Sequence, residues 1–173
     1  EAFASIFGKE KRGIGVGVLS DHYDALGWMS MSGQTYYLHG KDQNVYLTQM
    51  DADTLQAQLD ELYFLVIDSY DVSSLGKEKI KAIEKWVKNG GWLLIGTGER
   101  GKDTLGGFDS SFMEVSCKRV SKVGEENDAS KEMQQLGSYS GFTGIDFSQM
   151  PVAKLQRNNI NASKSEAYPG WVY

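Results

Sequence analysis

The stretch YFLVIDSYDVSSLGKEKIKAIEKWVKNGGWLLIGTG, residues 63–98, decides the fold class of this chain. It opens with an apolar run that ends at Asp68, and a strand that is apolar on both faces is typical of the interior of a covered, usually parallel, sheet. A helix is predicted next over 76–91, because apolar residues share one face and lysines occupy the other. Gly90 and Gly91 predict the left-handed end of that helix. The apolar run that follows predicts another buried strand.

The N-terminal part of the chain adds a further strand to this pattern. Residues 13–21 predict a buried strand whose alternating glycines leave one face open to the close approach of another backbone. Residues 24–40 are ambiguous and are expected to form a helix that breaks at Gly33.

A strand and a helix are predicted between these two regions. Residues 44–50 predict the strand. The helix is expected to be capped by Asp51 or Asp53, with Gln56 in position to complete a capping box. One apolar stripe is expected along it, formed by Leu55, Leu59 and Leu62.

Residues 44–98 therefore predict alternating strands and helices with short, right-handed connections. We expect an α/β fold, a three-layer α/β/α sandwich with a mostly parallel sheet that is flavodoxin-like in build. One domain is expected over 1–173, in which 155–173 is extended or begins a further segment. The other predicted elements are strands at 111–120, 142–147 and 151–156 and a short helix at 127–137.

Composition and charge exclude several function classes. The 173 residues carry a net charge of −5 and a pI of about 5.1, so the chain lacks the basic field that drives nucleic-acid binding. No apolar run approaches the roughly 20 residues that a membrane-spanning helix needs. The one cysteine, Cys117, has no partner for an internal disulfide. The 4 tryptophans and 9 tyrosines are interpreted as packing residues, with stacking on sugars as the alternative.

The glycine-rich turn after the last apolar run has two spacings that occur in phosphate-binding loops. Gly96 to Lys102 is one residue short of a P-loop, in which a Ser or Thr hydroxyl after the lysine binds Mg²⁺. Asp103 occupies that position, and its carboxylate would repel phosphate oxygens. The spacing Gly96-x-Gly98-x-x-Gly101 matches a dinucleotide fingerprint, but it follows a late strand instead of the first one. We therefore expect no nucleotide cofactor.

The order of apolar strand, helix, glycine pair and apolar strand resembles the class I glutamine amidotransferase-like superfamily. The resemblance is to non-catalytic members in bacterial exported and membrane-anchored proteins, and it covers residues 44 to about 108. It implies the amidotransferase-like version of the flavodoxin-like fold and an extracytoplasmic, anchored location in a larger bacterial protein. The chain begins at Glu1 without a methionine, which we also interpret as a piece of a longer protein. The matching residues are Leu65, Val66, Ile67, Asp68, Trp86, Val87, Gly90, Gly91, Leu94, Ile95 and Gly96.

Catalytic members of that superfamily place a cysteine on the sharp turn after this last strand, with a histidine and a glutamate late in the chain. Here the turn falls on Thr97 or Gly98, and both histidines, His22 and His39, lie upstream of it. Cys117 lies about 20 residues beyond the turn. The resemblance therefore implies the fold without the amidotransferase activity, and no catalytic residue is expected.

Polar residues follow three of the predicted strands, and ligands of α/β sheets bind in the crevice at the carboxyl ends of the strands. We expect these residues to line one candidate pocket. The carboxylates and the histidine among them have no spacing that demands a metal ion, and none is expected. The candidate residues are Ser20, Asp21, His22, Asp68, Ser69, Thr97, Gly98, Glu99 and Arg100.

These observations favour a non-enzymatic domain that binds a small ligand or a protein partner, with no cofactor and no nucleic acid. The alternative is a hydrolase or transferase with its pocket at Asp21, Asp68 and Thr97. In that case Thr97 or a bound water would attack, with His22 as the base. A threonine hydroxyl needs such a base before it can act as a nucleophile.

Overall fold

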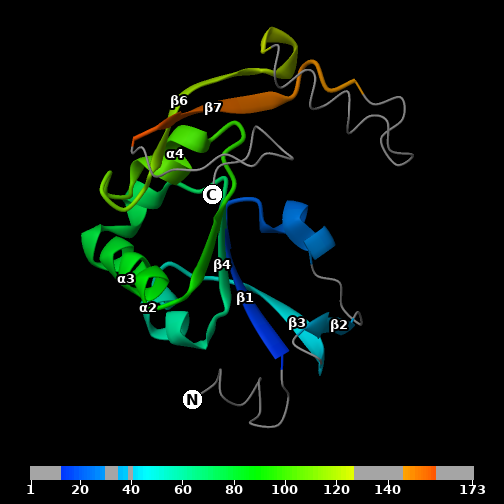
Figure 1. The fold of residues 1–173 in the computed structure, drawn as a ribbon, viewed down its shortest axis with the longest axis vertical. Helices are drawn as coiled ribbons and strands as arrows, with labels where there is room; N and C mark the ends of the chain where they lie inside the picture. The colour runs from blue at the N-terminus through cyan, green and yellow to red at the C-terminus, as the bar shows by residue number, and fades with distance from the viewer. Residues whose placement is uncertain (1–12, 30–34, 39–40, 127–145, 159–173) are drawn as a thin grey trace. The chain divides into compact units, whose positions relative to one another are not determined.

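The computed structural model describes residues 13–29, 35–38, 41–126 and 146–158 (Figure 1). Over these residues the chain has an α/β fold, with a mostly parallel sheet of five strands and a second sheet of two strands. Contacts group the chain into two compact units. The first unit is Glu1–Asp68 with Lys81–Leu94, and the second unit is Ser69–Ile80 with Ile95–Tyr173. The prediction of one domain over 1–173 stays a prediction.

The first unit contains the larger sheet, whose strands hydrogen-bond in the order β2-β3-β1-β4-β5. β1 pairs in parallel with β3 and with β4, whereas β2 pairs antiparallel with β3. Two elements, α3 and β5, begin in one unit and end in the other. The bounds are β1 (Gly13–Ser20), η1 (Tyr23–Met29), β2 (Thr35–Leu38), β3 (Lys41–Gln49), α2 (Leu55–Gln58), η2 (Leu59–Glu61), β4 (Phe64–Asp68), α3 (Lys77–Lys88) and β5 (Trp92–Ile95).

Strand β1 lies at the centre of this sheet, and its structure explains the alternating glycines. A side chain at Gly15 would lie 3.1 Å from the backbone carbonyl oxygen of Glu61. The Tyr63 N–H donates to the Gly15 carbonyl at 2.9 Å. The predicted close approach of another backbone is therefore confirmed. The opposite face of the strand packs into an apolar cluster of Ile14, Val16, Val18 and Val66, against which Tyr23, Leu26, Val45, Leu47 and Phe64 lie.

The region 24–40 forms two elements instead of one broken helix. Its first part is the 3-10 helix η1, which ends at Met29, and its second part is the short strand β2. The predicted break at Gly33 lies outside the described residues. A strand in this region was not predicted.

The helix after β3 is much shorter than its sequence pattern indicates. Its N-cap residue is Thr54, whose side chain makes no capping hydrogen bond. Asp51 Oδ1 instead accepts a hydrogen bond from the Asp53 N–H at 2.8 Å. The predicted capping box of Asp53 and Gln56 is wrong, because the N-cap residue is Thr54 and Asp53 lies in the turn before it. The predicted apolar stripe is confirmed, since all three of its leucines are buried: Leu55, Leu59 and Leu62.

The C-terminal end of α3 explains the segment Trp-Val-Lys-Asn-Gly-Gly. Gly90 has a φ of 104°, which is the left-handed backbone that glycine adopts at helix ends. The N–H groups of Gly90 and Gly91 donate to the carbonyls of Val87 and Trp86 at 2.9 and 3.1 Å. A Cβ at Gly91 would lie 2.2 Å from the indole ring of Trp86. The predicted glycine stop is confirmed, and the second glycine is needed for the tryptophan to pack.

The prediction that 92–98 forms a buried strand is wrong. The strand covers only Trp92–Ile95 and is the last strand in the order of the sheet. Trp92 is 63% exposed and Leu94 is 52% exposed. A strand at the edge of a sheet has one neighbouring strand instead of two, so an apolar run does not ensure its burial.

The second unit is built around an antiparallel pair of strands. β6 (Val115–Lys122) pairs with β7 (Pro151–Arg157), and the helix α4 (Gly101–Gly106) packs against β6 and against η3 (Val72–Leu75). The element η4 (Val123–Glu125) follows β6 directly. These strands confirm the predictions for 111–120 and 151–156, with shifted bounds.

Two further predictions concern residues between β6 and β7. The helix predicted at 127–137 lies outside the described residues, and so do positions 142–145 of the strand predicted at 142–147. Asp146 and Phe147 belong to no strand. Over the described ranges, no helix has the length and apolar character that crossing a membrane requires.

Candidate functional site

In the first unit, polar residues stand at the ends of two neighbouring strands. Ser20 ends β1 and Asp68 ends β4, and the two residues are partners across the sheet. Ser20 is buried, and its Oγ accepts a hydrogen bond from the backbone N–H of His22 at 3.0 Å. This bond turns the chain after β1, and the side chains of Asp21 and His22 are exposed. The sheet therefore brings Ser20 and Asp68 together and leaves Asp21 and His22 on the turn.

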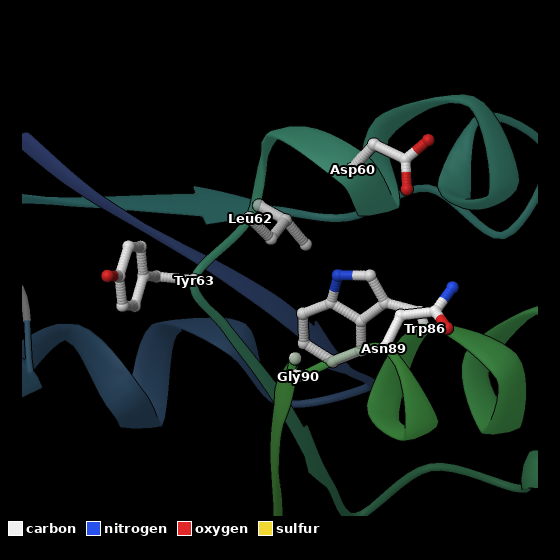
Figure 2. A pocket seen from close by; sticks show the side chains of 7 residues that line it. Asp60, Leu62, Tyr63, Trp86, Asn89 and Gly90 are labelled. Atoms are coloured by element: carbon white, nitrogen blue, oxygen red, sulfur yellow. The ribbon is translucent and has the colours of Figure 1, made fainter.

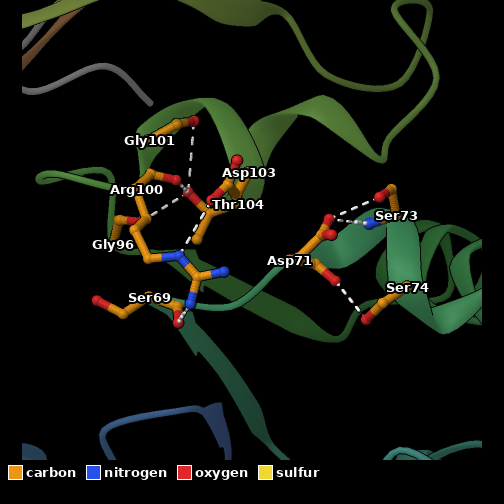
Figure 3. Close-up of polar contacts among 9 residues, drawn as sticks. All are labelled: Ser69, Asp71, Ser73, Ser74, Gly96, Arg100, Gly101, Asp103 and Thr104. Atoms are coloured by element: carbon orange, nitrogen blue, oxygen red, sulfur yellow. Dashed lines mark hydrogen bonds and ion pairs between the residues drawn. The ribbon is translucent and has the colours of Figure 1, made fainter.

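In the second unit, Ser69 has a strained backbone directly after β4. Its φ is 49°, and no other described residue apart from glycine has a positive φ. Arg100 Nη1 donates to the Ser69 carbonyl at 2.6 Å, and Arg100 Nε donates to the Asp103 carboxylate at 3.0 Å (Figure 3). The guanidinium group therefore ties the turn after β4 to the start of α4. Ser69 and Arg100, two of the predicted site residues, are therefore joined by a hydrogen bond.

Buried and capping hydrogen bonds hold the turns around α4 and η3. Thr104 is fully buried, and its Oγ1 lies 3.0 Å from the Gly96 carbonyl oxygen and 3.2 Å from that of Arg100. Asp71 Oδ1 accepts from the Ser73 N–H at 3.0 Å and from Ser73 Oγ at 2.6 Å (Figure 3). Thr104 therefore fixes the backbone on both sides of the turn 97–99, which carries the remaining site residues, and Asp71 fixes the start of η3.

That turn, residues 97–99, opens to solvent beside a pocket. Thr97 is half-buried, whereas Gly98 and Glu99 are exposed. The Glu99 carboxylate makes no hydrogen bond or ion pair with any described residue. A pocket of about 480 Å³ lies next to it, formed by this turn together with β6, η4 and the start of β7. Its polar lining residues are Glu99, Ser121, Lys122, Glu125 and Gln149.

Hydrogen bonds within the pocket wall hold the lysine in place. Lys122 Nζ donates to Gln149 Oε1 at 2.6 Å. The backbone N–H of Lys122 donates to Glu125 Oε2 at 3.2 Å. Two glutamates and one lysine therefore line the pocket, and of the two glutamates only Glu99 has no hydrogen-bond partner among the described residues.

A charged network stands behind this pocket, on the β6–β7 pair. Arg119 and Lys154 are directly opposite each other in the strand register, an arrangement that is unfavourable for like charges. Glu126 accepts hydrogen bonds from Arg119, from Ser121 Oγ at 2.8 Å and from Lys154 Nζ at 3.2 Å. The Arg119 and Ser121 donors, followed by Lys154, lower the pKa of Glu126 from 4.5 to about 2. This carboxylate therefore bridges two cations that would otherwise repel each other.

The lone cysteine does not have the environment of a reactive thiol. Cys117 lies in β6, and burial raises the pKa of its thiol, an effect that Lys102 partly opposes. A thiol with a raised pKa stays protonated near neutral pH and is a poor nucleophile. In the part of the chain that the structure describes, no three His, Cys, Asp or Glu side chains gather as metal ligands.

Comparison with protein-family models, with curated proteins and with solved structures found no match to this chain. The resemblance to the amidotransferase-like superfamily therefore stays a prediction.

The structure places the predicted residues in two groups and adds others to them. Ser20, Asp21, His22 and Asp68 belong to the first unit, and Ser69, Thr97, Gly98, Glu99 and Arg100 belong to the second. Sequence reasoning missed the pocket residues on β6, η4 and β7. Their only signal was two apolar-rich segments at 111–120 and 151–156, and the pairing of these segments is not visible in either one alone.

Proposed function

We propose that this chain is a non-enzymatic binding domain with a three-layer, flavodoxin-like fold related to the amidotransferase-like superfamily. The observation that carries the proposal is the pocket of about 480 Å³ beside the turn after β5, which Glu99 lines. In the resembled enzymes this turn carries the nucleophile. Here it presents a hydrogen-bond acceptor to a ligand.

The pocket walls indicate the chemistry of the bound group. Glu99 and Glu125 are acidic, and Lys122 is already hydrogen-bonded to Gln149. A group with N–H donors and positive charge complements this lining, because the Glu99 carboxylate accepts hydrogen bonds and is negatively charged. The ligand is therefore a small amine or guanidinium compound, or a lysine or arginine side chain of a protein partner.

The surroundings of the turn support binding over catalysis. The buried Thr104 hydroxyl and the Arg100 guanidinium are used to hold backbone carbonyls. Burial raises the pKa of the Cys117 thiol, which disfavours the thiolate. An acyl-transfer site needs a nucleophile activated by a base and a third group that orients the base.

The binding proposal is tested by titrating the ¹⁵N-labelled chain with ethylamine and with methylguanidinium. We expect the backbone amide signals of Glu99 and Ser121 to shift with these cations and to stay unchanged with acetate. The variant Glu99→Gln should lose the response, because it keeps the shape of the side chain and removes its charge. Glu78→Gln, an exposed glutamate that does not line the pocket, is the matched control. Equal binding by the wild type and Glu99→Gln would overturn the proposal.

The hydrolase alternative has its own test. Hydrolysis of p-nitrophenyl acetate is measured for the wild type and for Thr97→Ala and His22→Ala. We expect the rate of hydrolysis to be the same for the wild type and for both variants. A rate that falls in both variants would support the enzyme and contradict the binding domain.

We also propose that the domain lies on the outer side of the cytoplasmic membrane, as part of a larger anchored bacterial protein. The resemblance to exported members of the superfamily supports this location. Protease treatment of intact spheroplasts that express the full-length protein tests it. We expect the domain to be digested, and protection until the cells are lysed would contradict the proposal.

A further inference from the structure

A second pocket lies in the first unit, at the residues that lead into β4 and β5 (Figure 2). Its volume is about 240 Å³. It lies before these strands, whereas ligands of α/β sheets usually bind after them, so it is separate from the site proposed above. The lining residues that matter here are Asp60, Leu62, Tyr63, Trp86, Asn89 and Gly91.

The pocket is built by the same contacts that end α3. Trp86 is 8% exposed, and its ring lies against Gly91, where a Cβ would come within 2.2 Å of it. The Trp92 N–H donates to the Tyr63 carbonyl at 3.2 Å, which joins the two segments that form the walls. The indole ring is therefore held in one position before any ligand arrives, which lowers the entropic cost of binding.

Three polar groups around this pocket are left without partners in the described structure. The indole N–H of Trp86, the carboxylate of Asp60 and the carboxamide of Asn89 make no hydrogen bond to any described residue. Figure 2 shows the indole nitrogen on the edge of the Trp86 ring that is turned toward Leu62. No buried side-chain nitrogen or oxygen of the described residues lacks a partner, so the Trp86 indole N–H, which makes no hydrogen bond, is open to solvent and available to a ligand.

Together, the indole N–H, the carboxylate and the carboxamide disfavour ions and purely apolar molecules as ligands. The Asp60 carboxylate disfavours an anion, and the indole N–H needs an acceptor, which an ammonium group does not supply. A purely apolar ligand would bury the carboxylate and the carboxamide without hydrogen bonds, which costs free energy. Hydroxyl groups both donate and accept, so a neutral molecule with several hydroxyls satisfies all three groups at once.

The size and shape of the pocket narrow the choice further. Drug-sized ligands occupy pockets that begin at about 300 Å³, and this one is smaller. Tyr63 also lines the pocket and is 58% exposed, and Figure 2 shows its ring directed away from Trp86. We propose that this pocket binds a single neutral sugar ring. Trp86 and Asn89 donate hydrogen bonds to its hydroxyl oxygens, and Asp60 accepts from its hydroxyls.

The experiment follows the tryptophan indole N–H signals of the ¹⁵N-labelled chain by NMR. Glucose, galactose, mannose and N-acetylglucosamine are titrated separately. We expect at least one of them to shift the Trp86 signal with a saturable curve and a dissociation constant on the order of 1 mM, because one ring in an open pocket makes few contacts. The Trp92 signal should stay unchanged, since Trp92 does not line the pocket. Trp92→Phe identifies that signal.

Variants separate this pocket from adventitious binding. Asn89→Ala removes one hydrogen bond and Asp60→Asn removes the charge of one acceptor, so each should weaken the sugar response by roughly 2- to 10-fold. Lys88→Ala is the matched control on the same helix end, and we expect it to bind as the wild type does. The rest of each spectrum reports whether the variant remains folded.

Three results would overturn the proposal. One is a Trp86 signal that none of the four sugars shifts. Another is a shift produced by tetramethylammonium or by acetate in place of the sugars. The third is a sugar response that Asn89→Ala and Asp60→Asn leave at wild-type strength. All of these outcomes are independent of the amine-binding pocket in the second unit.

Discussion

The two units differ in what fills their interiors. The first unit buries aliphatic side chains from a central sheet, and Val18, Leu55, Leu65 and Ile67 are fully buried there. Among the described residues, the second unit buries fewer apolar side chains, and the side chain of Thr104 is fully buried there. An aliphatic interior depends on area removed from water, whereas a buried hydroxyl depends on specific partners. Substitutions of single side chains should therefore destabilise the two units by different mechanisms.

The strongest test of this difference is the removal of a fully buried leucine from the first unit. Leu65→Ala should lower the free energy of unfolding by about 2–5 kcal/mol, because it removes buried methyl groups and leaves a cavity. Leu94→Ala, on a side chain that is 52% exposed, should change it by less than about 0.5 kcal/mol. Urea denaturation measures both, and hydrogen exchange should accelerate more in β1 and β4 than in β6 and β7. Equal acceleration in all four strands would show that the units unfold together.

The second test removes the buried hydroxyl of the second unit. Thr104→Val keeps the size of the side chain and leaves the Gly96 carbonyl without its hydrogen bond. We expect a loss of about 1–3 kcal/mol, the usual cost of an unsatisfied buried group. Thr97→Val is the matched control, because the Thr97 hydroxyl makes no hydrogen bond to a described residue. A similar loss from both variants, measured by urea denaturation, would contradict the assigned role of Thr104.

The smallest expected effect is the pH dependence that Glu126 gives to the second unit. Its pKa of about 2 in the folded chain lies below its ordinary value of 4.5. Its contribution to stability is therefore complete above about pH 4.5 and is lost as the pH falls toward about 2. The effect is the smallest of the three because solvent screens the ion pairs at the surface.

The variant Glu126→Gln isolates this contribution. It should be less stable than the wild type at neutral pH, since Arg119 and Lys154 then face each other without a carboxylate between them. Its stability should also fall less over the acid interval. Parallel acid-denaturation profiles of the wild type and the variant would show that Glu126 is not the group responsible.

The sequence predicted those elements whose signal is local and repeated. Strand β4 is a continuous apolar run and α3 has one apolar face, and both were confirmed, as was the glycine stop at Gly90. The capping box failed because Asp53 lies in a turn before the helix, whose N-cap residue is Thr54. The burial of β5 failed because an apolar run does not reveal whether a strand has one neighbour or two.

The candidate site was only partly visible for a related reason. Glu99 was named from its place after a predicted strand, and the structure puts it at the mouth of a pocket. Lys122 and Gln149, on the other side of that pocket, come together only because β6 pairs with β7. No local sequence pattern predicts such a pairing, because the pattern of apolar and polar residues in a strand does not identify its partner strand.

What the sequence by itself determined is the α/β class and the mostly parallel order of the main sheet, because hydrophobic periodicity and glycine positions act over a few neighbouring residues. What only the tertiary structure decided is the exposure of β5, the pairing of β6 with β7, and the packing of Trp86 onto Gly91. These features depend on contacts between distant segments. Their energies depend on which groups are in contact, and groups that are far apart in the sequence come into contact only when the chain folds.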